Sequence, residues 1–314
     1  MARNLIASKL IESVRNRAMI PDDITVYDDA AILGILNEEI DVGLLETLLT
    51  LHEEHLVTYT DKTATDGKRL VIPSRAVASK LRDIHKLSGS TTREMSRVTL
   101  EELSDYDSGY SHTSSDLFYV EGDEIVLITP SSEVMRMYFH LRPNVISLES
   151  SCAQITAIDR TTGVIQFNTI PSAFAGIADI DFIQDKSPNK ILAFDISVTS
   201  VSVSTRNVTV NPASIPSRLS VGDWVCPLET SPYANVPTEM HPLLAQRAAI
   251  YILEALGDNE NLASARGKLN QMEKSIQKIM DDRVEGAPRK IKSRHGFLAG
   301  NSGIRRSKLG RGNY

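Results

Sequence analysis

The stretch MHPLLAQRAAIYILEALGDNENLASARGKLNQMEKSIQKIMDDRV, residues 240–284, decides the fold. Its first half is apolar on most faces and predicts a buried helix that begins near Pro242, a residue suited to the first helical turn. Gly257 fits a helix C-cap, and Asp258 or Asn259 fits the N-cap of a second helix. The second helix carries a stripe of apolar residues at helical spacing: Leu262, Leu269, Met272, Ile276 and Ile279. The short joint between the two helices predicts an antiparallel helical hairpin.

A basic segment follows this hairpin. Residues 286–314, here called the C-terminal arm, contain no acidic residue. Their eight basic residues are Arg289, Lys290, Lys292, Arg294, Arg305, Arg306, Lys308 and Arg311. The whole chain has 34 basic and 40 acidic residues, so residues 1–285 have 26 against 40, a formal charge of −14. The Gly, Ser, Asn and basic content of the arm predicts a segment that is disordered until it binds a partner.

Three interpretations of the arm stay open: a solubilising end, a nucleic-acid-binding segment and a docking segment. Binding to phosphates would follow from counterion release, but Phe297 and Tyr314 are its only aromatic residues, which disfavours base stacking. Docking is favoured because apolar side chains alternate with the cations: Phe297, Leu298, Ile304 and Leu309. This pattern suits an acidic, partly apolar groove on a protein partner.

The composition is typical of a soluble globular protein. The chain has 314 residues, of which 41% are hydrophobic and 24% charged. No apolar run approaches the roughly 20 residues that span a bilayer, so we expect no membrane partner. Cys152 and Cys226 are the only cysteines, and we expect both to be reduced core residues of a protein made in the cytoplasm.

The order of patterns along the chain predicts an α+β fold. Apolar periodicity predicts helices over residues 5–20, 27–40, 42–59 and 75–87, and alternation with turn signals predicts antiparallel strands between Leu117 and Pro227, in either a sandwich or a small barrel. We expect the N-terminal helices and the C-terminal hairpin to share one core, with the β region inserted between them. The predicted parts are 1–88 (N-terminal helical part), 89–116 (surface connection), 117–237 (inserted β domain), 238–285 (helical hairpin) and 286–314 (extended basic arm).

No catalytic, metal or cofactor site is predicted. His52-Glu53-Glu54-His55 places its histidines three residues apart, whereas the zinc-protease helix needs four, so a solvated helix face is the preferred interpretation. The residues Asp179, Asp181 and Asp185 lack the spacing and the glycine of a calcium loop. The alternating segment ADID, residues 178–181, is expected to place its aspartates on the polar face of a strand. Phosphate-loop, nucleophile-elbow and dinucleotide motifs are absent from the sequence. We therefore expect a protein that is not an enzyme.

The layout resembles bacteriophage head-to-tail connector proteins, also called adaptor or head-completion proteins. The β region, the basic end and four further stretches carry the resemblance. The four stretches are IESVRNRAMIP (11–21), AAILGILNEEIDVGLLETLLTLHEEHLVTY (30–59), RLVIPSRAVASKLRDI (69–84) and RAAIYILEALGDNENLASARGKLNQMEKSIQKI (247–279). It implies a homo-oligomeric ring of twelve copies in the neck of a virion, assembled in the host cytoplasm. The arm of each copy would reach onto the portal protein, the opposite face would receive tail or nozzle proteins, and genomic DNA would pass through the lumen without sequence recognition. The β region is larger than minimal helical connectors carry.

Two other functions remain open from the sequence. Another neck, baseplate or tail component would share the helical and β texture without contacting the portal. A nucleic-acid-binding regulatory protein would use the basic arm on its own, and its DNA binding would depend steeply on salt.

Overall fold

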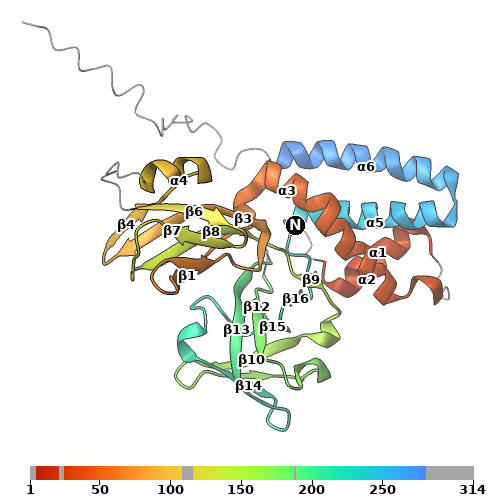
Figure 1. Cartoon of the computed structure of the whole chain (residues 1–314). Coiled ribbons are helices and arrows are strands. Elements are labelled where there is room, and N and C mark those ends of the chain that lie inside the picture. Colours follow the sequence, from red (N-terminus) through yellow and green to blue (C-terminus); the bar gives the residue numbers. More distant parts are fainter. Residues whose placement is uncertain (1–4, 21–24, 108–115, 187–188, 281–314) are drawn as a thin grey trace, which may run out of the picture. The chain divides into compact units, whose positions relative to one another are not determined.

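The computed structural model of the chain describes residues 5–20, 25–107, 116–186 and 189–280 (Figure 1). These residues form helices and several antiparallel sheets, one of which closes into a six-stranded barrel. The predicted α+β class is therefore confirmed. In the described part of the chain, no helix combines the length and the apolar character that a membrane crossing requires.

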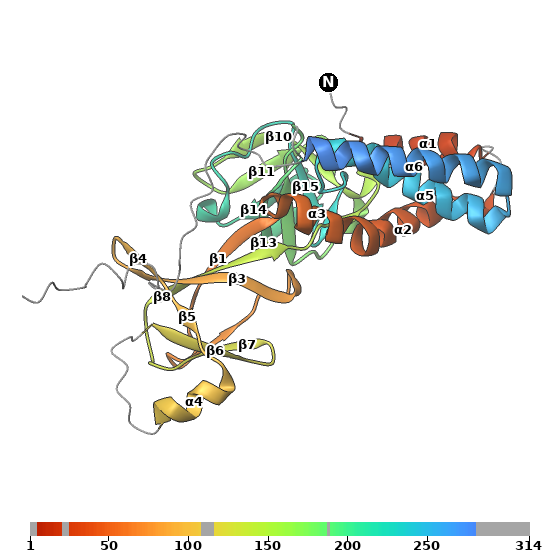
Figure 2. The same cartoon turned by 90° about the horizontal axis from the view of Figure 1, so that it is seen from above.

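The helices from the two ends of the chain contribute to one hydrophobic core (Figure 2). Their bounds are α1 Ala7–Ala18, α2 Asp29–Glu38, a π-helical turn Glu39–Leu44, α3 Leu45–His52, α5 His241–Leu256 and α6 Asn259–Ile279. The helix α5 packs against α1, α2 and α6, and Leu244, Ala248 and Ile252 on it are fully buried. Burial of apolar side chains on most of its faces makes α5 the centre of this core.

The joint between α5 and α6 has the predicted caps. Gly257 adopts the left-handed conformation with φ 71°, and its N–H donates to the carbonyl oxygens of the last turn of α5. The Asp258 side chain accepts a hydrogen bond from the N–H of Asn261 at the start of α6. The predicted stripe of α6 faces the core as far as Ile276, which is buried, but Ile279 is 65% exposed.

His241, the first residue of α5, ties the hairpin to the N-terminal segment. Its ring is fully buried, Nδ1 accepts from the N–H of Leu5 at 3.3 Å, and Nε2 donates to the carbonyl oxygen of Ala234 at 3.2 Å. Because Nδ1 is an acceptor, the imidazole is neutral with its proton on Nε2. Burial lowers the pKa of His241, although the Ala234 carbonyl acts in the opposite direction.

Two four-stranded sheets follow the N-terminal helices and share a second core (Figure 2). One sheet has the order β1-β8-β3-β4, with β1 Val57–Thr63, β8 Val134–Leu141, β3 Ala76–Ser88 and β4 Thr91–Glu94. The other has the order β2-β7-β6-β5, with β2 Arg69–Val71, β7 Glu124–Leu127, β6 Leu117–Glu121 and β5 Ser96–Arg97. In β8 buried and less buried residues alternate, so Met135, Met137 and Phe139 point into this core.

The structure corrects the prediction of helices over residues 42–59 and 75–87. The first ends at His52, followed by a single 3₁₀ turn, and β1 begins at Val57. The second is the strand β3, in which Ala78 and Ser79 have positive φ and the pairing register with β8 shifts. This irregularity breaks the alternation that normally marks a strand, so the apolar residues fall at helix-like spacing.

The predicted surface connection at residues 89–116 is also more structured than expected. Its described part contains β4, β5 and the helix α4 Leu100–Asp107. The helix starts with a capping box: the N–H of Thr99 donates to Glu102 Oε2 at 2.8 Å, and the N–H of Glu102 donates to Thr99 Oγ1 at 3.3 Å. The first strand, β1, thus begins sixty residues before the predicted start of the β region at Leu117. The five-part division of the chain into domains stays a prediction.

The closed barrel occupies the later part of the β region and encloses a third core. Its strands, in spatial order, are β10 Ala153–Asp159, β11 Val164–Phe167, β14 Asn207–Val210, β13 Ile191–Ser202, β12 Asp179–Ile183 and β15 Trp224–Pro227. The predicted antiparallel strands between Leu117 and Pro227 are confirmed, and of the two predicted alternatives the later strands form a small barrel. Two antiparallel hairpins turn at Gly122 and at Gly163. A short parallel pair, β9 Val145–Ile146 with β16 Thr230–Ser231, lies on the segments that flank the barrel.

The glycines of two hairpins provide a matched test of the turn geometry. Gly122 and Gly163 have φ of 60° and 76°, so alanine at either position meets the same backbone strain of about 1–2 kcal/mol. A Cβ at Gly122 meets no atom within 4 Å, whereas a Cβ at Gly163 lies well inside van der Waals contact of the backbone carbonyl oxygen of Val210. In urea unfolding, Gly163→Ala is expected to lose at least about 1 kcal/mol more than Gly122→Ala. Equal losses would show that the barrel hairpin moves to make room.

Candidate functional site

The structure does not place the predicted docking residues. All twelve, from Arg289 to Arg311, lie in residues 281–314, outside the described residues. Their assignment as a docking arm therefore stays a prediction. Within the described part of the chain, the most concentrated polar cluster is a buried one around Arg75, here called the Arg75 cluster.

Arg75 lies immediately before β3, and its side chain is almost completely buried. Nη1 donates to Asp181 Oδ2 at 3.2 Å and to Asp195 Oδ1 at 2.9 Å, and Nη2 donates to Asn144 Oδ1. Glu229 Oε1 lies 3.6 Å from Nε. One guanidinium thus connects the start of β3 with β12, β13 and the two segments that flank the barrel.

Asp181 is the buried anion of the Arg75 cluster. Besides Arg75, its Oδ2 accepts from Asn144 Nδ2 at 2.7 Å and from the N–H of Glu229 at 3.2 Å, and its Oδ1 accepts from the N–H of Asp195 at 3.0 Å. Asp195 has φ 55° at the place where the register between β12 and β13 shifts, and this irregularity turns its N–H toward the carboxylate. Burial raises the pKa of Asp181, and the nearby Arg75 charge opposes the rise.

This arrangement is suited to holding segments together. A carboxylate that already accepts four hydrogen bonds has little freedom to take a proton from a substrate, and a guanidinium stays charged at any working pH. The carboxylates of Asp195 and Glu229 reach solvent, so water screens the net negative charge of the cluster. We interpret the Arg75 cluster as a structural joint.

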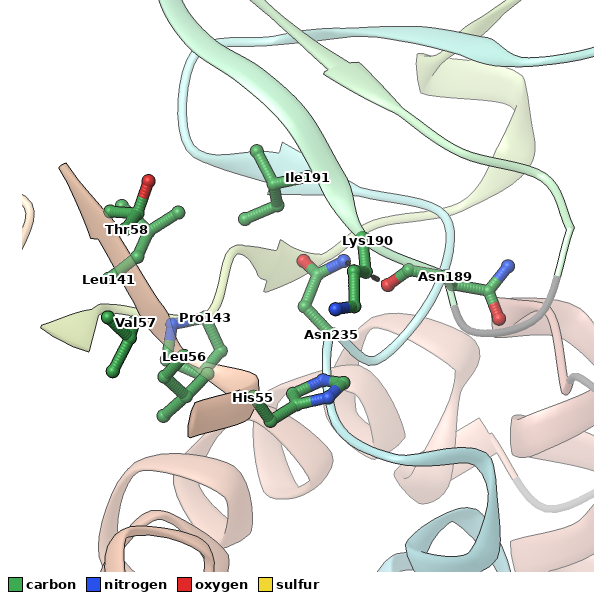
Figure 3. A pocket seen from close by; sticks show the side chains of 10 residues that line it. All are labelled: His55, Leu56, Val57, Thr58, Leu141, Pro143, Asn189, Lys190, Ile191 and Asn235. Carbon is green, nitrogen blue, oxygen red and sulfur yellow. Dashed lines mark hydrogen bonds between the residues drawn. The ribbon is translucent and has the colours of Figure 1, made fainter. Parts of the chain in front are cut away.

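A cavity of about 110 Å³ adjoins the Arg75 cluster, since Asn235 in its wall accepts a hydrogen bond from the N–H of Asn144 at 3.3 Å. Figure 3 shows the residues that line the cavity. Its wall includes His55 from the turn after α3, Leu141 at the end of β8, and Lys190 and Asn235 from the barrel side. The Asn235 amide donates to the backbone carbonyl of Asn189 at 3.4 Å, the hydrogen bond drawn in Figure 3. Sites for drug-sized ligands or cofactors enclose about 300–1,000 Å³, so this cavity has room for a few water molecules.

The His52–His55 segment is packed against the sheet, so its prediction as a solvated helix face needs correction. His52, Glu53 and His55 are partly buried where the turn after α3 meets the sheet of β1, β8 and β3. Glu53 lies 3.1 Å from Arg82 and 3.4 Å from Nε2 of His140. Among the described residues, no group of three or more His, Cys, Asp or Glu side chains has an arrangement that could hold a metal ion. Glu53 of this segment thus forms an ion pair with Arg82 of β3.

The three aspartates that were tested as a calcium loop have separate environments. Asp179 and Asp181 lie on β12, as predicted, but Asp181 is buried while Asp179 accepts from the hydroxyl of Ser197 at 2.9 Å. Asp185 Oδ1 accepts from Tyr233 Oη at 2.7 Å and from Trp224 Nε1 at 3.0 Å. Burial, and then the hydrogen bond to Asp185, raise the pKa of Tyr233 above its ordinary value.

Sequence reasoning missed both the Arg75 cluster and the Asp185 contacts. The hydrogen-bond partners of Arg75 lie about 70 to 120 positions along the chain, and those of Asp185 about 40 to 50 positions away. Hydrophobic periodicity carries no information about contacts of this separation.

No known protein family matches the chain, and none of the curated proteins matches it.

Proposed function

We propose that the protein is a head-to-tail connector of a bacteriophage, a non-enzymatic subunit that joins the portal to the tail. The proposal is carried by one observation: a helical hairpin, built into a core with the N-terminal helices, is followed after residues 280–285 by a segment of eight cations and no anion. The helix α6 ends at Ile279 and the arm begins seven residues later, at Gly286. A cationic extension on an otherwise acidic protein is the composition expected of a part that docks onto a partner.

The arrangement of domains is part of the same proposal. The N-terminal helices with the hairpin α5–α6 form the body of the subunit, and the β region between them is an insert that faces a different partner. In a ring, each subunit uses two different faces on its two neighbours. Exposed apolar side chains on the helical segments, such as Val42 and Tyr251, are candidates for burial at such contacts.

The formal charge of −14 on residues 1–285 suits a conduit for DNA. An acidic wall repels phosphates, so the duplex slides through instead of adhering. The arm, which carries eight cations and no anion, would then grip the acidic surface of the portal. This division of charge separates DNA passage from docking within one chain.

Binding of the purified full-length protein to purified portal rings tests the proposal. Neutralising all eight basic residues of the arm to glutamine is expected to weaken binding at least about 100-fold, because each desolvated charge contact contributes on the order of a kcal/mol. A smaller variant, Arg305→Gln with Arg306→Gln and Lys308→Gln, is expected to weaken it about tenfold. The matched control replaces three exposed lysines of α6, Lys268, Lys274 and Lys278, and should change the affinity less than twofold.

The same experiment separates the alternatives. Electron microscopy of the wild-type protein with portal is expected to show a second ring stacked on the portal. Portal binding that is unchanged in the eight-residue variant contradicts the docking role of the arm. Tight DNA binding that falls steeply with salt, in the absence of portal binding, would instead support the regulatory function.

A further inference from the structure

The only two cysteines of the chain are cross-strand neighbours. The strands β10 and β15 pair antiparallel, with Ala153 opposite Val225 and Gln154 opposite Trp224. The next position in this register brings Cys152, which directly precedes β10, opposite Cys226 of β15. Residues separated by 73 others in sequence therefore face each other across one strand pair.

The pair has the geometry that accepts a disulfide. The N–H of Ile155 donates to the carbonyl of Asp223 at 2.9 Å, so this position of the ladder is a hydrogen-bonded one. Such positions alternate along an antiparallel pair, which makes Cys152 and Cys226 a non-hydrogen-bonded pair. Consistently, the N–H of Cys152 donates to Glu149 on its own segment at 3.1 Å. Non-hydrogen-bonded partners have Cα atoms about 4.5 Å apart, inside the range of about 4.4–6.8 Å found for disulfides.

The two thiols are free, buried and in contact. Cys152 is 3% exposed and Cys226 is fully buried, and they share an apolar cluster with Ile183 and Tyr233 on the outer side of the barrel wall. Burial raises the pKa of the Cys226 thiol, and the hydrogen bond with Cys152 raises it further. Both effects keep the Cys226 thiol protonated under reducing conditions.

The two cysteines lie at the end of the strand pair that has the fewest paired residues in the barrel, here called the barrel seam. The pairing of β10 with β15 closes the barrel through two register pairs, whereas β12 with β15 and β10 with β11 each have four. A covalent bond at the end of this seam would fasten the place where the barrel has the fewest backbone contacts. It would also close the chain between Cys152 and Cys226 into a loop of about 75 residues, which restricts the unfolded state strongly.

We propose that Cys152 and Cys226 form a latent disulfide pair, reduced when the protein is made and oxidised by a peroxide to a single intrachain bond that locks the barrel seam. The thiolate of Cys152, the more exposed of the two, attacks one oxygen of hydrogen peroxide. It becomes a sulfenic acid as the other oxygen leaves as hydroxide, which takes the thiol proton to form water. The Cys226 sulfur then attacks the Cys152 sulfur, and the sulfenic hydroxyl leaves with the Cys226 proton as a second water. Two thiols are oxidised and one peroxide is reduced.

Mass spectrometry of the full-length protein tests this directly. After the reduced wild type is incubated with hydrogen peroxide and the excess is removed, the intact mass is expected to fall by two hydrogen atoms. A digest without reductant should contain one Cys152–Cys226 peptide pair. The melting temperature of the oxidised protein is expected to rise by about 5 °C or more, and to return to its starting value with dithiothreitol.

Two cysteine variants and a second oxidant serve as controls for this experiment. Cys152→Ser and Cys226→Ser should each abolish both the mass change and the temperature shift. A glutathione redox buffer measures how strongly the fold favours the bond, and the effective concentration of the two thiols should be at least tenfold higher in the native protein than in urea. The proposal is overturned if the native thiols stay reduced, oxidise only to sulfinic acid or to intermolecular dimers, or form a bond that lowers the melting temperature. None of these outcomes depends on portal binding.

Discussion

Replacing Arg75 by methionine is expected to destabilise the protein by about 3–5 kcal/mol, because the change leaves Asp181 as a buried charge without its cation. Asp181 is fully buried, and Arg75 is its only cationic partner among the described residues. Methionine fills much of the space of the arginine side chain, so the lost charge dominates over lost packing. Urea unfolding monitored by circular dichroism measures the change.

The pH dependence of this loss identifies its cause. Burial raises the pKa of Asp181 and Arg75 opposes that rise, so the pKa rises further in Arg75→Met. A carboxyl whose pKa is higher in the folded than in the unfolded state binds its proton more tightly when folded. Between the two pKa values, stability therefore falls as the pH rises. The penalty of Arg75→Met should thus be larger at pH 8 than at pH 5, and a penalty independent of pH contradicts the buried-charge explanation.

Two further variants serve as controls for this prediction. Arg69→Met removes an arginine paired with Glu121 and Glu124 on the exposed β2–β7 side and should cost less than about 1 kcal/mol. The double variant Arg75→Met with Asp181→Asn removes the buried negative charge as well. It should be more stable than Arg75→Met alone at pH 8.

The elements that could be predicted from the sequence are those with local signals. The joint of α5 and α6 is set by Gly257 and Asp258, each of which satisfies backbone groups within four residues of itself. The hairpins of the barrel follow from strict alternation interrupted by turns such as that at Gly163. Each of these signals is contained in a short window, so no knowledge of the tertiary structure is needed to find it.

The wrong predictions come from strands that imitate helices. In β3, the residues Leu81 and Ile84 and the preceding Ala76 are the ones that face the second core. Their spacing is irregular because the strand bends at Ala78 and Ser79, and it matches a helical period better than an alternating one. Tertiary packing against β8 decides the outcome. The helix α4 was missed for a different reason. It lies in the segment predicted as a surface connection, although its capping box at Thr99 and Glu102 is a local signal.

The Arg75 cluster could not be predicted because its members come from distant segments. Arg75, Asn144, Asp181 and Asp195 each stand alone in a part of the chain that contains no motif. Only the pairing of β12 with β13, and the turns that precede β3 and β9, bring them together. The cysteines illustrate the same limit: their burial was predicted from residue type and is confirmed, whereas their contact requires the register of β10 with β15.

Replacing Leu244 by alanine is expected to cost about 2–5 kcal/mol, because this fully buried side chain lies at the centre of α5 and its loss leaves a cavity in the helical core. Leu256→Ala is the matched control: it makes the same change on the same helix at a side chain that is 51% exposed. This control should cost less than about 1 kcal/mol. Urea unfolding of the two variants gives the difference.

Hydrogen exchange of the Leu244→Ala variant then tests whether the helical ends of the chain form one cooperative unit. The helix α5 packs against α1, α2 and α6, and the barrel has a separate core of its own. If the helices open together, amides of α1 and α6 lose protection by the same free energy as those of α5, although α1 lies more than 200 residues away in sequence. Barrel amides should keep most of their protection, since the barrel core contains no residue of these helices. Equal loss in the helices and the barrel would instead mean that the β region cannot stay folded without the helices, and the proposed division into a helical body and an insert would fail.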